Sequence, residues 1–304
     1  MTAFPGPRKA TGMGIAHTTI NPAGTAERAA QKPDNDALSA LLALERPLVM
    51  GILNITPDSF SDSGRFIDPA TAIAHAATMV KQGADLLDIG AESTRPYGGA
   101  QPVSADEELA RLTPVLPAVV KLGLPVSIDT IKATVAAWAL DRGAAIVNDV
   151  WGLQRDPEMA KLIAARGVPV IVMHNREAAD GGLDIIADVL AFFARSLEIA
   201  SKAGIAREKI VLDPGIGFGK TPEQSIRCIA QLAKFKCFGL PLLIGASRKR
   251  FINSVTPSAP DDRIGGSIAS HLVAVGNGAA IIRAHDVAET VQALRVATAI
   301  GAAR

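Results

Sequence analysis

Residues 209–220 have the sequence Lys209-Ile210-Val211-Leu212-Asp213-Pro214-Gly215-Ile216-Gly217-Phe218-Gly219-Lys220. The apolar run in this stretch is typical of a buried β-strand, and it ends abruptly in the carboxylate of Asp213 and a turn rich in Pro and Gly. An ionised carboxylate is costly to bury unless several donors satisfy it, so a flat ligand with adjacent N–H groups would suit Asp213. Taken alone, the stretch fits a helix cap or a structural ion pair equally well.

Similar apolar runs recur along the chain and alternate with helical segments. The eight runs occupy residues 48–53, 85–89, 126–128, 145–147, 168–173, 209–212, 242–245 and 280–282. Strands that alternate with helices predict a parallel sheet, and eight such units in one domain of about 250 residues predict a single (β/α)8 TIM barrel. The main alternative is an open doubly wound sheet.

Polar and ionisable residues stand at the carboxyl ends of the eight runs, and this favours the barrel. They are Asn54, Asp88, Asp129, Asn148, His174, Asp213, Ser247-Arg248-Lys249 and Arg283-Ala284-His285. In a closed barrel the carboxyl ends of all strands surround one mouth, where barrel enzymes place their active sites. The loops after the first two strands, residues 56–66 and 92–101, are long and irregular, which is typical of active-site lids.

Composition restricts the remaining possibilities. The chain has 304 residues, 48% hydrophobic, and a net charge of +1, which predicts a soluble globular domain of enzyme size without the bulk charge to bind nucleic acid or a membrane. No run approaches the roughly 18 apolar residues of a membrane span. We expect residues 1–34 to form a flexible tail and residues 35–304 the barrel domain. We also expect Cys228 and Cys237 to be packing residues in a reducing cytoplasm.

The residues predicted at the mouth fall into two chemical zones. Asp129, Asn148 and Asp213 supply acceptors and one amide, which suit a flat heterocycle with an amidine-like edge. Donors that suit phosphate or carboxylate oxygens come from Arg95, Lys249, Arg283 and His285. Asn54 and Asp62 add hard oxygen ligands, where Mg²⁺ could bridge to a pyrophosphate. The two zones predict a substrate with a heterocycle at one end and a pyrophosphate at the other.

A set of motifs between about residues 47 and 300 resembles the dihydropteroate synthase family. In chain order the motifs are Gly51-Ile52-Leu53-Asn54-Ile55-Thr56-Pro57-Asp58-Ser59-Phe60-Ser61-Asp62, Ile89-Gly90-Ala91-Glu92-Ser93-Thr94-Arg95-Pro96, Ser127-Ile128-Asp129-Thr130, Asn148-Asp149, Leu212 to Lys220, Ser247-Arg248-Lys249 and Arg283-Ala284-His285-Asp286. The resemblance implies that this is a pterin-binding barrel.

The resemblance also implies a role for each matching residue. It implies that the pterin ring is bound by Asp129, Asn148, Asp213, Phe218 and Lys249. It implies that pyrophosphate, with Mg²⁺, is bound by Asn54, Arg95, Arg283 and His285. The implied p-aminobenzoate site consists of Phe60, Thr94, Arg95 and Lys249. The residues expected to be catalytic are Asp129, Lys249 and Arg283.

The reaction implied by the resemblance joins 6-hydroxymethyl-7,8-dihydropterin diphosphate to p-aminobenzoate, giving 7,8-dihydropteroate and pyrophosphate in folate biosynthesis. A Mg²⁺ cofactor, a homodimer and a sulfonamide target are further implications. The alternatives are a methyltetrahydrofolate corrinoid methyltransferase, on a similar barrel, and a catalytically silent pterin-binding paralogue. The chain departs from the family motifs at Tyr97, at Arg250 and in Met173-His174-Asn175-Arg176, which leaves the role of His174 open.

Overall fold

Eight parallel strands form the sheet of this protein, as the apolar runs predict. The computed structural model describes residues 37–56, 68–92 and 103–303. The strands are β1 (Leu48–Asn54), β2 (Leu86–Gly90), β3 (Val126–Asp129), β4 (Ile146–Asp149), β5 (Val170–Met173), β6 (Ile210–Asp213), β7 (Leu243–Ile244) and β8 (Ile281–Ala284). The predicted tail, residues 1–34, and most of the loops 56–66 and 92–101 lie outside the described residues.

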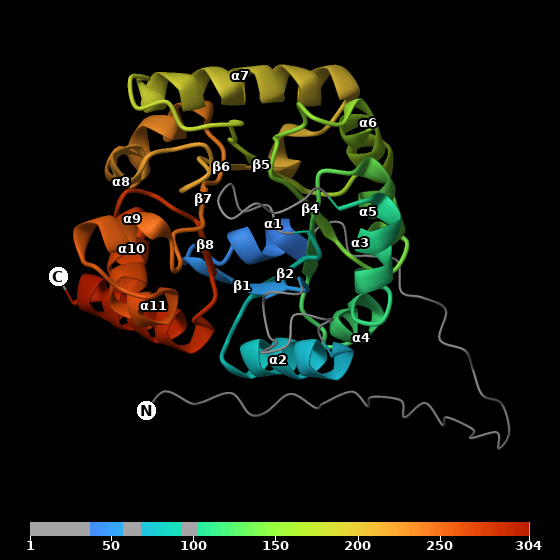
Figure 1. Cartoon of the computed structure of the whole chain (residues 1–304), viewed down its shortest axis with the longest axis horizontal. Coiled ribbons are helices and arrows are strands. Elements are labelled where there is room, and N and C mark those ends of the chain that lie inside the picture. The colour runs from blue at the N-terminus through green and yellow to red at the C-terminus, as the bar shows by residue number, and fades with distance from the viewer. Residues whose placement is uncertain (1–36, 57–67, 93–102, 304) are drawn as a thin grey trace, which may run out of the picture. The chain divides into compact units, whose positions relative to one another are not determined.

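The sheet closes into a barrel. Its strands pair in the order β6-β5-β4-β3-β2-β1-β8-β7. A parallel bridge between Leu212 in β6 and Leu242, next to β7, joins the two ends, and Leu212 N donates to Pro241 O at 2.9 Å. The predicted (β/α)8 barrel is therefore confirmed, and the open doubly wound sheet is wrong (Figure 1).

Helices surround the sheet (Figure 1). They are α2 (Pro69–Lys81), α3 (Ala105–Leu112), α4 (Leu116–Val120), α5 (Ala133–Leu140), α6 (Pro157–Arg166), α7 (Ile185–Ala203), α8 (Pro222–Ala230), α9 (Arg250–Val255), α10 (Ile264–Gly276) and α11 (Val287–Ala302), with 3₁₀ turns Arg207–Lys209, Leu232–Phe238 and Pro260–Arg263. Side-chain caps begin several of them: Asp68 and Asp184 accept backbone N–H groups of α2 and α7, and Thr221 forms a capping box at α8.

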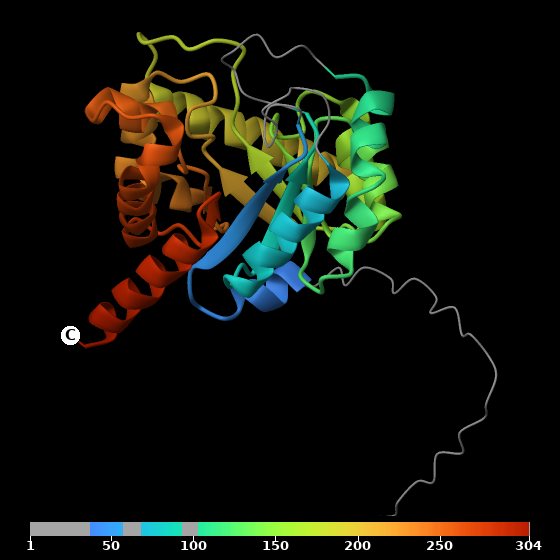
Figure 2. The same cartoon turned by 60° about the horizontal axis from the view of Figure 1, so that its bottom comes forward.

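Two apolar layers fix the position of the mouth. Alternate residues of each strand point inward or outward, so Leu86 belongs to the inner layer while Leu87 packs against the surrounding helices. Leu38 of the short helix α1 (Ala37–Leu42) joins the inner layer. Figure 2 shows α1 at the end of the barrel where β1 begins. This end is filled with apolar side chains, so polar residues that point inward gather at the opposite end.

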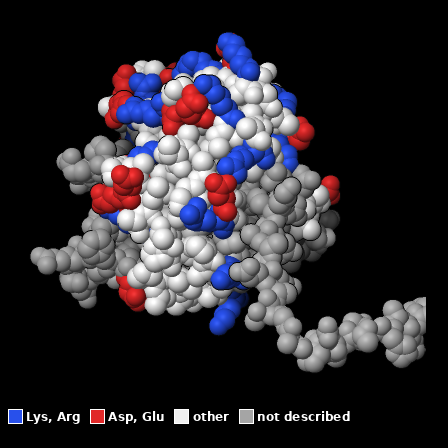
Figure 3. Space-filling view, turned by 90° about the vertical axis from the view of Figure 1, so that its right-hand side faces the viewer, with Lys and Arg blue, Asp and Glu red and all other residues white. Residues whose placement is uncertain are grey.

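The surface carries both signs of charge. On the face shown in Figure 3, acidic and basic side chains are interspersed, and Arg166 at the end of α6 pairs with Asp141 after α5 at 2.6 Å. Within the described ranges, no helix is long and apolar enough to cross a membrane. Cys228 is buried as expected, but Cys237 is exposed, so its prediction as a packing residue is wrong. It lies in the 3₁₀ turn between α8 and β7, which buries only part of its side chains.

Candidate active site

Six of the predicted site residues meet in one cavity at the carboxyl ends of the strands. The cavity is small, about 20 Å³, and is lined by Asp129, Asn148, Asp213, Phe218, Lys249 and Arg283, together with the apolar side chains of Val150, Met173 and Ile216. They come from β3, β4, β6, β8 and the loops after β6 and β7. The barrel thus brings together residues that are up to 154 positions apart in sequence, as between Asp129 and Arg283.

Asp88 organises one wall of this cavity, a role that sequence reasoning did not assign to it. Its Oδ2 atom accepts hydrogen bonds from Arg283 Nε at 2.6 Å and from Asn148 Nδ2 at 3.1 Å. Arg283 Nη2 also donates to Asp129 Oδ2 at 3.0 Å. The signal in the sequence was a carboxylate inside an apolar strand at an inward position of β2. Asp88 holds the guanidinium and the amide in fixed orientations, since its side chain is fully buried.

Burial changes the protonation equilibria of the two acidic residues that line the cavity. It raises the pKa of Asp129, and the neighbouring carboxylate of Asp88 adds to this rise, while Arg283 opposes it. Burial also raises the pKa of Asp213 to about 6, against the hydrogen bond from the Gly215 N–H and the charge of Lys249. A ligand that brings N–H donors to either carboxylate would therefore stabilise its ionised form.

The turn after β6 needs its glycines. Asp213 Oδ1 accepts the N–H of Gly215 at 2.8 Å, and Gly215 has a φ of 66°. A Cβ atom at Gly215 would lie 2.0 Å from the carbonyl oxygen of His174, so no other residue fits there. The turn carries Phe218 to the cavity, where Lys249 Nζ lies 4.1 Å from the centre of its ring.

The predicted Ser247-Arg248-Lys249 group separates in space. Lys249 lines the cavity, but Arg248, with a φ of 57°, pairs with Asp286 through Nε at 3.0 Å and Nη2 at 2.5 Å. Its Nη1 atom also donates to Asp261 at 2.6 Å. Arg248 thus fixes the loop after β7 against the start of α11 and does not line the cavity.

His285 contributes no positive charge to the mouth. Its ring Nδ1 lies 3.1 Å from Ser247 Oγ. Burial lowers its pKa to about 3, and the charges of Arg283 and Arg248 add to this effect. The sequence analysis grouped His285 with the donors that suit phosphate oxygens. The neutral ring can still donate a single hydrogen bond to an anion.

His174, whose role the sequence left open, lies behind the glycine turn. Its Nε2 atom is 2.9 Å from Asp188 Oδ2, and its Nδ1 atom is 2.6 Å from Lys220 Nζ. The fully buried Lys220 also donates to the carbonyl oxygen of Phe218 at 3.1 Å. Burial lowers the pKa of His174 to about 4 and that of Lys220 to about 8. His174 therefore links α7 to the turn that carries Phe218.

Of the remaining predicted site residues, the structure describes Asn54 alone. Asn54 ends β1 and is half-buried, and β1 pairs directly with β8, the strand that contains Arg283. The predicted residues Phe60, Asp62, Thr94 and Arg95, and the departure at Tyr97, lie outside the described residues. Within the described ranges, no three His, Cys, Asp or Glu side chains form a group that could hold a metal ion.

Comparison with known proteins agrees with the site. The profile of a family described as pterin binding enzyme matches residues 50–285. Dihydropteroate synthase of Bacillus subtilis is 45% identical over 250 residues, which cover 82% of this chain and 87% of that protein. Xanthomonas albilineans dihydropteroate synthase, solved in complex with 7,8-dihydropteroate, is 41% identical with a TM-score of 0.78 and covers 85% of this chain and 95% of its own. The Yersinia pestis dihydropteroate synthase, solved with a sulfonamide drug, is 41% identical with a TM-score of 0.79, covering 86% and 96%.

The chain belongs to the pterin-binding enzyme family. Within that family it is a dihydropteroate synthase, a transferase of folate biosynthesis. The activity predicted from the motifs is confirmed, and the relatives favour it over the methyltransferase alternative.

Proposed function

We propose that the barrel cavity binds the pterin ring of 6-hydroxymethyl-7,8-dihydropterin diphosphate and that p-aminobenzoate reacts with it at the mouth. The observation that carries this proposal is the meeting of three acceptor side chains, Asp129, Asn148 and Asp213, with two cations in one cavity. The cations are Lys249 and Arg283. Acceptors suit the N–H edge of the ring, and cations suit the diphosphate.

Unsatisfied acceptors support the placement of the ring. Asp129 Oδ1 and Asn148 Oδ1 are buried and accept no hydrogen bond from the described residues. A buried acceptor without a donor costs about 1–3 kcal/mol, so N–H groups of the pterin would lower the free energy of the complex. Phe218 and Lys249 would flank the ring, since they lie together in the lining of the same cavity.

The proposed reaction is a substitution at the methylene carbon. The lone pair of the aniline nitrogen forms the new C–N bond while the C–O bond breaks, pyrophosphate keeps that electron pair, and the nitrogen loses a proton to solvent. Asp129 would stabilise positive charge on the methylene and the ring, and Lys249 and Arg283 would stabilise the leaving group. We propose that Phe60, Thr94, Arg95 and Lys249 bind p-aminobenzoate. Arg95 would bind pyrophosphate as well.

Mg²⁺ fits the donor chemistry at the end of β1. The amide of Asn54 is half-buried and forms no hydrogen bond with other described residues, which leaves its oxygen for a hard cation. Mg²⁺ commonly takes only one or two protein ligands and completes its shell with waters and substrate phosphates. We therefore propose Asn54 and Asp62 as its ligands, where the ion would neutralise charge on the diphosphate.

We further propose that the enzyme is a homodimer in the cytoplasm. Three large apolar side chains are exposed on the adjacent helices α10 and α11: Val273 at 52%, Val296 at 53% and Ile300 at 60%. A dimer that buries them would remove apolar area from water. Both cysteines are free thiols, as is usual in a reducing compartment. Sedimentation of the double variant V296E/I300E tests this proposal. If these side chains form the dimer interface, the variant should sediment as a monomer.

Turnover tests the proposed reaction most simply. The purified chain is mixed with the pterin diphosphate, p-aminobenzoate and Mg²⁺, and pteroate and pyrophosphate are measured together. We expect equal amounts of both products, and a loss of both in Lys249→Ala. A matched control is Lys202→Ala, which removes an exposed lysine on α7 whose partner among the described residues is Glu198, at 2.6 Å. Pyrophosphate without pteroate would mean hydrolysis, and neither product would support the silent paralogue.

A further inference from the structure

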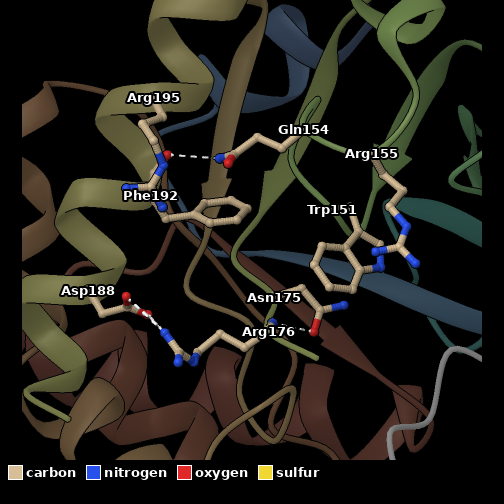
Figure 4. Close-up of a pocket in the computed structure, with 8 residues that line it drawn as sticks. All are labelled: Trp151, Gln154, Arg155, Asn175, Arg176, Asp188, Phe192 and Arg195. Carbon is tan, nitrogen blue, oxygen red and sulfur yellow. Dashed lines mark hydrogen bonds and ion pairs between the residues drawn. The ribbon is translucent and has the colours of Figure 1, made fainter. Parts of the chain in front are cut away.

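A second cavity, of about 270 Å³, lies between α7 and the loops after β4 and β5. Figure 4 shows Trp151 and Asn175 on one side of it and Asp188, Phe192 and Arg195 of α7 on the other. Among the described residues, none lines both this cavity and the barrel cavity. This volume is just below the usual range for small-molecule sites, which suits a small ligand. The reaction described above makes no use of this cavity.

The loop that forms one wall of the second cavity is held rigidly. Asp149 at the end of β4 accepts the backbone N–H groups of Trp151 at 2.9 Å and Leu153 at 2.7 Å. Ser196 Oγ of α7 donates to the carbonyl oxygen of Gly152 at 2.6 Å. The loop is therefore tied both to its own strand and to α7, and the backbone at Trp151 is held in place before any ligand arrives.

Several N–H donors in this cavity lack acceptors. Arg176 binds both oxygens of Asp188 through Nη1 at 3.0 Å, but its Nε atom is buried and has no partner among the described residues. Asn175 uses its Oδ1 atom to accept the N–H of Arg176 at 2.8 Å, and its Nδ2 atom donates to no other described residue. Buried donors normally find an acceptor, so these positions fit ligand oxygens.

Among the charged side chains that line the second cavity, those without an ion-pair partner among the described residues are positive. Asp188 is paired with Arg176 and contacts His174, and Arg155 pairs with Glu177 outside the lining. Arg195 is exposed and forms no ion pair with another described residue; its guanidinium lies 5.8 Å from the ring of Phe192. Among the described residues, no carboxylate neutralises the guanidinium of Arg195, so it suits an anion.

We propose that this cavity is a binding site for a small, flat organic carboxylate. Its carboxylate oxygens would accept hydrogen bonds from Arg195, Arg176 Nε and Asn175 Nδ2, and its carbon skeleton would lie against the apolar rings of Trp151 and Phe192. A guanidinium with two further N–H donors matches the geometry of a carboxylate, and aromatic walls favour a flat body over a small inorganic ion.

Tryptophan fluorescence tests this proposal, because the chain has only two tryptophans. The variant Trp138→Phe removes the one on α5 and leaves Trp151 as the only reporter. This variant is titrated with phthalate, a flat dicarboxylate, and in parallel with inorganic phosphate. We expect a saturable change with phthalate at a concentration at least tenfold lower than with phosphate.

Further substitutions in the same background locate the bound anion. Arg195→Ala should weaken phthalate binding at least tenfold, while Lys249→Ala in the barrel cavity should leave it unchanged. Arg142→Ala is a matched control, since Arg142 is an exposed arginine that lies, in the unsubstituted chain, 4.1 Å from the ring centre of Trp138 and does not line this cavity. The proposal is overturned by the absence of a saturable change, by equal responses to phthalate and phosphate, or by a response that depends on Lys249 and not on Arg195.

Discussion

Replacing Asp88 by Asn should damage both stability and activity, although we do not expect this carboxylate to touch a substrate. Its Oδ2 atom accepts one bond from a buried guanidinium at 2.6 Å and one from an amide at 3.1 Å. Hydrogen bonds to charged groups contribute about 1.5–3 kcal/mol, and breaking a buried ion pair costs about 3–5 kcal/mol. Arg283 keeps its bond to Asp129, so we expect a loss of about 3 kcal/mol in the free energy of unfolding.

The assay for Asp88→Asn combines urea unfolding with steady-state kinetics. Because Arg283 and Asn148 lose their common anchor, we expect kcat/KM to fall by about a hundredfold. The control is Asp141→Asn, which breaks an ion pair of the same 2.6 Å length between exposed side chains and should cost less than about 1 kcal/mol. A loss of stability in Asp88→Asn no larger than in the control would refute the assigned role of Asp88.

Four further predictions concern other parts of the chain. Asp213→Asn should weaken pterin binding by about 2 kcal/mol, because an amide NH2 would face a ring donor; calorimetry that gives an unchanged Kd would exclude this contact. Lys220→Met removes the donor that holds the Phe218 carbonyl and should raise the KM for the pterin diphosphate about tenfold, while a rise in the KM for p-aminobenzoate alone would contradict it. Burial lowers the pKa of His271 to about 4, so the folded chain resists protonation of this ring, and the free energy of unfolding decreases as the pH falls from about 6.5 to 4. When urea unfolding is compared at pH 7.5 and 4.5, this decrease should be about 2 kcal/mol smaller in His271→Gln. Removal of residues 2–34 should leave the activity and the Tm nearly unchanged, and a large drop in either would show that this segment packs on the barrel.

The fold was predictable because its signals are local. Each strand is a short apolar run, and the polar residue at its carboxyl end has to face the mouth once the barrel closes. This reasoning found five residues of the cavity, among them Asp213 and Lys249, and the family resemblance added Phe218. The family motifs then supplied the substrates, which no pattern of apolar and polar residues contains.

Interactions between distant residues were not predictable. The period of two along β2 directs Asp88 inward, but it does not say that the partners of Asp88 are Asn148 and Arg283, which are 60 and 195 positions away. The neutral state of His285 depends on burial and on nearby guanidinium groups, and these are properties of the folded chain. Arg248 and Lys249 are neighbours in sequence, yet the positive φ of Arg248 separates their side chains.

A crystal structure of the chain with 6-hydroxymethyl-7,8-dihydropterin diphosphate, without p-aminobenzoate, tests the placement of the substrate most directly. We predict that the ring lies in the barrel cavity, that its N–H groups donate to Asp213 and Asn148, and that the diphosphate lies beside Arg283. A pterin bound outside this cavity, or one whose N–H edge makes no contact with Asp213, would contradict the account.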